Sequence, residues 1–162
     1  MPSILQLVKT FSSNYPNIKF APGERFSWSP SNSTIYYVDS NNNTGNDATS
    51  SEESSPALLV HELGHALLGH ASYQRDVELV GMEAAAWEEA RKIAKSHGID
   101  ISDDDVQDHL DTYREWLHSR STCPNCTANG FQTGKLTYSC PACTHNWRVN
   151  EARLCALRRY SL

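Results

Sequence analysis

The chain has 162 residues, of which 39% are hydrophobic and 20% charged, a composition typical of a globular protein with one ordinary core and a small appended module. No apolar run approaches the length of a membrane span, so we expect no membrane insertion. The formal net charge of -5 argues against nucleic-acid binding over the whole surface of the protein.

The amino-terminal segment predicts a helix over residues 3–14. Its apolar residues fall on one helical stripe, and Pro16 ends the pattern. The segment lacks the apolar run and cleavage site of a secretory signal. We therefore expect a cytoplasmic protein, in which paired cysteines hold metal more often than disulfides.

Three short segments rich in β-branched and aromatic residues follow, at residues 18–20, 26–28 and 34–38. Pro, Gly, Ser and Asn separate them, so they are predicted to form two or three short antiparallel strands. Residues 40–55 are almost entirely polar and are expected to form a mobile loop.

Three further helices are predicted, at residues 56–71, 76–96 and 103–119. Ser55 and Pro56 suit the start of the first, and Gly98 suits the end of the second. Ser102 is a candidate cap for the third. Beyond residue 121 the composition changes to Cys, Pro, Asn, Gly and Thr, so we expect one domain at 1–120 and another at 121–162.

The first of these helices contains the motif His61-Glu62-Leu63-Gly64-His65, of the form H-E-x-x-H. Four residues advance a helix by about 400°, so both imidazoles lie on one face and can reach one metal ion. Glu62 lies about 100° from His61, an offset that suits a general base acting on a water at the metal. Neutral imidazoles bind Zn²⁺ without cancelling its charge, and the retained charge lowers the pKa of a bound water. The motif therefore predicts a catalytic zinc site.

A catalytic zinc ion usually has a third protein ligand. On a continuous helix His70 would point about 140° away from His65. Glu83 is the better candidate, because a helix-turn-helix connection would return its face toward the histidines. Glu78 remains open, being nearer the turn.

The H-E-x-x-H motif, with Glu83-Ala84-Ala85-Ala86 on the next helix, resembles the gluzincin class of metallopeptidases, particularly the minimal ImmA/IrrE-like peptidases. The resemblance covers residues 20–96. It implies a small zincin-like α+β fold, zinc bound by His61, His65 and Glu83, and Glu62 as the general base. It also implies that the strand at 34–38 is the sheet edge along which an extended peptide substrate docks.

A second resemblance, to SprT-like peptidases, depends on His97-Gly98 followed by a cysteine-rich segment. In that family the third zinc ligand is a histidine, so His97 stays an alternative to Glu83. The position before Gly98 also fits the end of a helix, where a histidine complements the helix dipole.

Two Cys-x-x-Cys pairs lie thirteen residues apart in the carboxy-terminal segment. Four thiolates at this spacing match structural zinc, and residues 130–138 could form the hairpin of a zinc ribbon. Such a small module would depend on its metal for folding. The four predicted ligands are Cys123, Cys126, Cys140 and Cys143.

The sequence leaves two functions open. The first is a zinc metallopeptidase that acts on a protein or peptide and uses one catalytic and one structural Zn²⁺. The second is an inactive zincin scaffold whose ribbon binds nucleic acid or protein. Aromatic and basic residues of the ribbon could contact single-stranded nucleic acid, although packing of Trp147 over the cysteines is the favoured role. These residues are Phe131, Tyr138, Trp147, Arg148, Arg153, Arg158 and Arg159.

Overall fold

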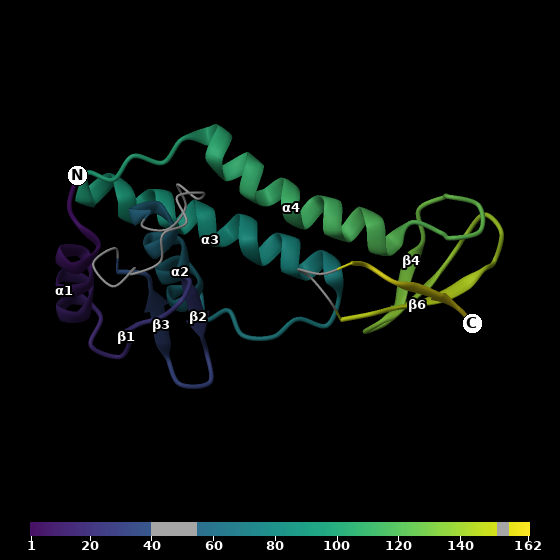
Figure 1. Cartoon of the computed structure of the whole chain (residues 1–162), viewed down its shortest axis with the longest axis horizontal. Coiled ribbons are helices and arrows are strands. Elements are labelled where there is room, and N and C mark those ends of the chain that lie inside the picture. Colours follow the sequence, from purple (N-terminus) through teal and green to yellow (C-terminus); the bar gives the residue numbers. More distant parts are fainter. Residues whose placement is uncertain (40–54, 152–155) are drawn as a thin grey trace, which may run out of the picture. The chain divides into compact units, whose positions relative to one another are not determined.

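The computed structural model describes residues 1–39, 55–151 and 156–162. Within these ranges the chain is α+β, with four helices and two small sheets (Figure 1). These residues also include a cluster of four cysteines. The loop expected at residues 40–55 lies outside the described residues except for Ser55. Arg153, one of the basic residues of the predicted ribbon, lies outside them as well.

The chain divides into two compact units. The first comprises residues 1–71 and 82–103, and the second comprises residues 72–81 and 104–162. Helix α3 (Asp76–His97) contributes residues to both. The domain boundary expected after residue 120 stays a prediction of the sequence.

Helix α1 (Ile4–Asn14) forms where the apolar stripe predicted it. Ser3 and Gln6 make a reciprocal capping box, in which each side chain accepts a hydrogen bond from the backbone of the other. The stripe of Ile4, Leu7 and Phe11 is buried. Burial of this stripe and the cap together stabilise a short helix that would be marginal alone.

The first sheet has the order β1-β3-β2, built from β1 (Lys19–Pro22), β2 (Ser27–Ser29) and β3 (Thr34–Tyr37). Strand β3 is antiparallel to β2 but parallel to β1, so the prediction of a purely antiparallel sheet is wrong. The chain reverses direction twice between β1 and β3, which makes the two run in the same sense. The expectation that β3 is the sheet edge is also wrong, because it is hydrogen-bonded on both sides.

Helix α2 (Pro56–Leu67) packs against β2 and β3 (Figure 1). Its buried residues include Leu59 and Leu63. Pro56 occupies a first-turn position as expected, but the Ser55 side chain makes no capping bond. The helix ends four residues earlier than predicted. Gly69 has a φ of 66°, a left-handed conformation that turns the chain out of the helix.

The second sheet is antiparallel, with the order β4-β5-β6-β7. Strands β4 (Phe131–Gly134) and β5 (Thr137–Ser139) form the predicted hairpin, and β6 (Asn146–Val149) and β7 (Arg159–Ser161) extend it. One sheet face is buried: Trp147 stacks on Tyr138 with ring centroids 5.6 Å apart and is fully buried. Trp147 therefore has the packing role that the sequence favoured.

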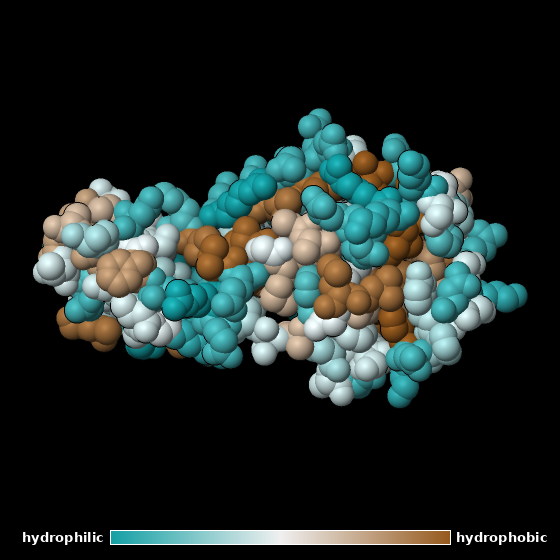
Figure 2. All heavy atoms as spheres, turned by 180° about the vertical axis from the view of Figure 1, so that it is seen from behind, coloured by the Kyte–Doolittle hydropathy of each residue, from teal (hydrophilic) through white to brown (hydrophobic). Residues whose placement is uncertain are grey.

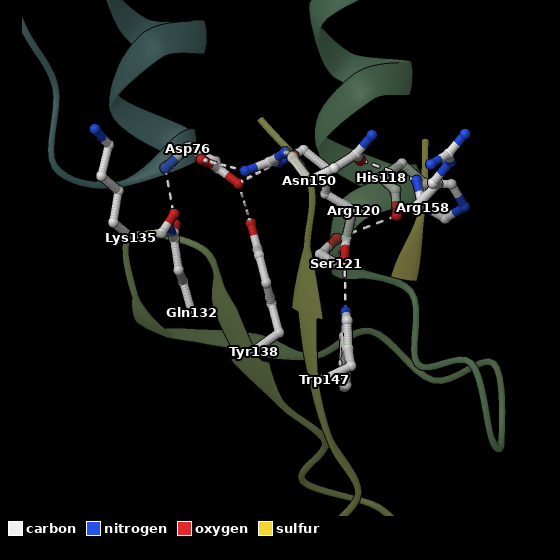
Figure 3. Close-up of polar contacts among 10 residues, drawn as sticks. All are labelled: Asp76, His118, Arg120, Ser121, Gln132, Lys135, Tyr138, Trp147, Asn150 and Arg158. Carbon is white, nitrogen blue, oxygen red and sulfur yellow. Dashed lines mark hydrogen bonds and ion pairs between the residues drawn. The ribbon is translucent and has the colours of Figure 1, made fainter. Parts of the chain in front are cut away.

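A buried charged pair joins the start of α3 to the end of helix α4 (Asp103–Ser121) within the second unit (Figure 3). Arg120 Nε donates to Asp76 Oδ2 at 2.6 Å, and the hydroxyl of Tyr138 donates to the same oxygen at 2.6 Å. Arg120 also donates to the Asn150 carbonyl. Both charges are almost fully buried, and these hydrogen bonds offset much of the cost of their desolvation.

The exposed side of α4 is polar. Figure 2 shows hydrophilic side chains along this helix at the top of the view, in agreement with the exposed Asp108, Asp111 and Arg114.

Within the described residues, no helix combines the length and apolar character needed to cross a membrane. The expected cytoplasmic location stays a prediction.

Candidate metal centres

The two histidines of the H-E-x-x-H motif lie one turn apart on the buried face of α2. Only 2% of His61 and 7% of His65 is exposed. Their Nε2 atoms are 3.1 Å apart and face the same point. The two imidazoles therefore lie on one face of the helix, as the spacing of the motif predicted.

Glu83 reaches the same point from helix α3. Its Oε2 atom lies 3.1 Å from His61 Nε2 and 3.5 Å from His65 Nε2. A tetrahedral zinc ion with metal–ligand distances of about 2.0–2.2 Å holds its ligand atoms about 3.3–3.6 Å apart. The three groups therefore fit a single ion, and His61, His65 and Glu83 together could hold a metal.

Close packing of α2 on α3 brings Glu83 within reach, and Gly64 permits it. A Cβ atom on Gly64 would lie 2.5 Å from the carbonyl oxygen of Ala86, closer than real Cβ contacts. Ala86 is fully buried and one helical turn beyond Glu83. The glycine inside the motif is thus a packing requirement of this site.

Two aromatic neighbours orient the histidine rings. Trp87 stacks on His61 with ring centroids 4.3 Å apart. His70 places its Nδ1 atom 2.8 Å from His65 Nδ1, on the opposite side of the ring from the shared point. The expectation that His70 points elsewhere is wrong, because it assumed a continuous helix and α2 ends at Leu67.

Glu62 lies beside the three groups and is held by strand β2. The backbone N–H of Trp28 donates to Glu62 Oε2 at 2.7 Å, and the Trp28 indole donates to the His70 carbonyl at 2.8 Å. Burial raises the pKa of the Glu62 carboxyl to about 7, outweighing the lowering by His65 and by the Trp28 bond. A carboxylate in this setting can accept and return a proton near neutral pH.

The ionisation of His61 and Glu83 suits metal binding. Burial lowers the pKa of His61, which favours the neutral imidazole that ligates metal. Burial alone would raise the pKa of Glu83, but hydrogen bonds with His61 and His65 hold it below its usual value. Glu83 is therefore a carboxylate in this cluster.

The other candidate ligands have separate roles. Glu78 is exposed and accepts from the backbone N–H groups of Gln74 and Arg75 at the start of α3. His97 Nδ1 bonds the Ile93 carbonyl at the end of α3, and its ring packs edge-on against Phe11. Both belong to helix ends, and neither is in the cluster with His61 and His65.

The second cluster gathers all four predicted cysteines. The Sγ atoms of Cys123 and Cys143 are 3.7 Å apart, and those of Cys126 and Cys140 are 3.5 Å apart. Four sulfurs around a zinc ion at about 2.3 Å are about 3.8 Å from one another. The thiols are free, so the four could hold a metal ion in a closed tetrahedral site.

The two cysteine pairs are built alike. In each, the N–H of the residue after the second cysteine donates to the carbonyl of the first, from Thr127 to Cys123 and from Thr144 to Cys140, both at 3.0 Å. Both threonines have positive φ, 64° and 61°. Hydrogen bonds from the Asn125 amide and the His145 backbone, with smaller contributions from the neighbouring thiols, lower the pKa of the Cys143 thiol to about 6 and favour the metal-binding thiolate.

No protein-family model, curated protein sequence or solved structure matches the chain. Local spacing in the sequence pointed to Glu62 and to six of the seven candidate ligands, whereas Glu83 was chosen from the expected helix-turn-helix connection and the family resemblance. It missed Trp28, His70 and the role of Gly64, because these depend on a strand edge, a helix end and a helix crossing. The only available signal was the glycine inside the motif, which indicates a close approach when it lies in a buried helix.

Proposed function

We propose that the chain is a zinc-dependent metallopeptidase with a zincin-like first unit. One observation carries the proposal: the Glu62 carboxyl interacts electrostatically with His65 and Glu83, two of the three groups that fit one metal ion, and is held by the backbone of strand β2. A purely structural metal site has no use for an extra carboxylate at its side. The gluzincin resemblance of the sequence supports the same reaction.

The donor set favours zinc. Two imidazoles and one carboxylate form the three-ligand set of catalytic zinc in peptidases, and they leave one coordination position for water or substrate. The four-thiolate cluster matches structural zinc instead. We therefore propose two zinc ions per chain with separate roles.

Each residue around the first cluster has a defined task. A zinc ion bound there would supply Lewis acidity, polarising a peptide carbonyl and making water more acidic. Glu62 takes the proton from the attacking water and passes it to the leaving amine. The Trp28 N–H orients the Glu62 carboxylate, while His70 and Trp87 hold the two imidazole rings.

The substrate proposed for this site is a peptide in an extended conformation. Strand β2 has β3 as its one described neighbour, so its other edge is the open edge nearest Glu62. Trp28 gives its N–H to Glu62 and not to β3, and backbone alternation directs its carbonyl to the same outer edge. A substrate strand can bond to that carbonyl by strand addition.

The direct test combines metal counting with proteolysis. The purified zinc-loaded chain should contain two zinc atoms and should cleave unfolded casein or a mixed peptide library, read by mass spectrometry. Glu62→Gln should keep both metals and lose activity by about 10²- to 10⁴-fold, the range of general acid–base catalysis. Glu88→Gln, the same change on the exposed side of α3, should leave the activity unchanged.

Two results would contradict the proposal: one zinc atom held by the cysteines alone, or full activity in the Glu62→Gln variant. Either would favour the alternative of an inactive scaffold with a binding module. The position of Glu62 beside the cluster argues against that alternative, because a scaffold needs the ligands but not the base.

A further inference from the structure

The outer face of the second sheet carries aromatic and basic side chains that have no role in the proposed peptidase reaction. The strand register places Phe131, Ser139 and Asn146 in one row and Arg148 with Tyr160 in the next. Their neighbours along β5 and β6, Tyr138 and Trp147, point to the buried face. The sheet therefore separates its aromatic residues into a packed set and an exposed set.

The exposed set is aromatic and cationic. Phe131 is 54% exposed and Tyr160 is 40% exposed. Arg148 is also exposed, and its guanidinium lies over the Tyr160 ring with Cζ 4.7 Å from the centroid. Phe131 and Tyr160 are on opposite edge strands, three strand spacings or about 14 Å apart, and Arg148 lies on a strand between them.

This part of the chain is basic although the protein is acidic. Residues 122–162 contain five basic residues and one acidic residue, a formal charge of +4. The whole chain carries -5, so residues 1–121 carry -9. A zinc ion with four thiolates would contribute -2 and still leave the segment positive. The five basic residues are Lys135, Arg148, Arg153, Arg158 and Arg159.

Not every residue that the sequence suggested is available for binding. Tyr138 and Trp147 are buried and cannot stack on a base. Arg159 donates to the Thr122 carbonyl at 2.6 Å. Arg148 and Arg158 are exposed and make no ion pair with any residue that the structure describes.

We infer that this sheet face binds single-stranded nucleic acid, with bases stacked on Phe131 and Tyr160 and phosphates near Arg148 and Arg158. Exposed rings on a sheet offer π-faces to unstacked bases, and arginines beside them neutralise the backbone. A base pair in a duplex has no free face, so a duplex should bind more weakly. The two rings and the arginine between them suit a strand of about four nucleotides, the lower end of known site sizes.

The test measures binding of fluorescein-labelled dT15 and U15 to the full zinc-loaded chain by anisotropy over a range of salt concentrations. Phe131→Ala and Tyr160→Ala should each raise Kd by roughly 5- to 150-fold, as expected for losing the stacking of one base, and leave the salt slope unchanged. Arg148→Gln should raise Kd and reduce the slope of log K against log salt by about 0.7, as expected for one lost contact with a single strand. Binding of either oligonucleotide supports the inference, and the ratio of the two Kd values measures any contribution of the 2′-hydroxyl.

Arg114→Gln is the matched control, because it removes the same charge from an exposed position on α4 and should leave Kd unchanged. Zinc content of each variant confirms that the cysteine cluster is intact. The inference is overturned if duplex DNA binds as tightly as dT15, if binding does not weaken with salt, or if the three sheet variants bind like the parent. A protein that binds this face without any measurable nucleic-acid binding would also overturn it.

Discussion

The two metal-ligand clusters of this chain differ in how they are assembled. The four cysteines come from two similar loops within 21 residues of sequence, and each loop makes the same backbone hydrogen bonds. The cluster of His61, His65 and Glu83 comes from two helices that must pack closely. It also has Glu62 and His70 as polar neighbours.

We propose that the difference separates a closed site, the cysteine cluster, from an open site, the cluster of His61, His65 and Glu83. Four thiolates of similar geometry complete a tetrahedron and leave no position for a reactant. Three ligands with a carboxylate beside them leave a position where chemistry can occur. We propose that the first arrangement serves folding and the second serves catalysis, and the following experiments test that contrast.

The largest effect is expected from removing ligands of the cysteine cluster. Cys123→Ser combined with Cys140→Ser should unfold the sheet β4–β7, because structural zinc contributes about 10 kcal/mol or more to such small modules. Limited proteolysis should then cut the second sheet, while metal analysis should still find one ion per chain. Loss of both ions, or a protease-resistant sheet, would show that the two clusters do not have the independent roles proposed here.

Breaking the buried ion pair should have the next largest effect. Asp76→Ala leaves Arg120 buried without its carboxylate and should lower the free energy of unfolding by about 3–5 kcal/mol. Urea-induced unfolding of the zinc-loaded protein measures this. Asp108→Ala, on the exposed side of α4, should change stability by less than about 0.5 kcal/mol. Equal stability of the two variants would contradict the role given to the pair.

Gly64→Ala tests the helix contact behind the open site. The added methyl group meets the Ala86 carbonyl, so the helices must separate at a cost near the upper end of about 1–3 kcal/mol. The shift moves Glu83 away from the histidines and should weaken metal binding there, measured by competition with a chromophoric chelator. Gly81→Ala is the control: its Cβ meets nothing within 4 Å, and alanine should leave stability unchanged or raise it by up to about 1 kcal/mol. A Gly64→Ala protein with parental metal affinity would refute the packing argument.

The smallest predicted effect concerns His70. His70→Ala removes the partner of His65 Nδ1 and should weaken metal binding at the open site by about 10- to 100-fold, the usual effect of losing a group that orients a ligand. Binding by the cysteine cluster should not change, which separates this effect from general destabilisation. His118→Ala, at an exposed position of α4, should leave both sites as they are. Unchanged affinity at the open site would mean that His70 does not position His65.

Local spacing in the sequence was sufficient to identify His61, His65, Glu62 and the four cysteines. A helix places residues four apart on one face regardless of what surrounds it, and a Cys-x-x-Cys pair closes on itself. The helices and most strands were predictable for the same reason, since capping and periodicity involve only near neighbours. The choice of Glu83 also came from the sequence, but its place beside the histidines depended on the turn between α2 and α3, whose path the sequence did not define.

Only the tertiary structure decided how these elements meet. It put β3 at the centre of the first sheet, brought Trp28 to Glu62, and turned His70 back onto His65 after an early helix end. It also separated the buried Trp147 from the exposed Tyr160 on opposite faces of one sheet. Each of these contacts joins residues whose distance depends on packing between elements, and no local periodicity carries that information.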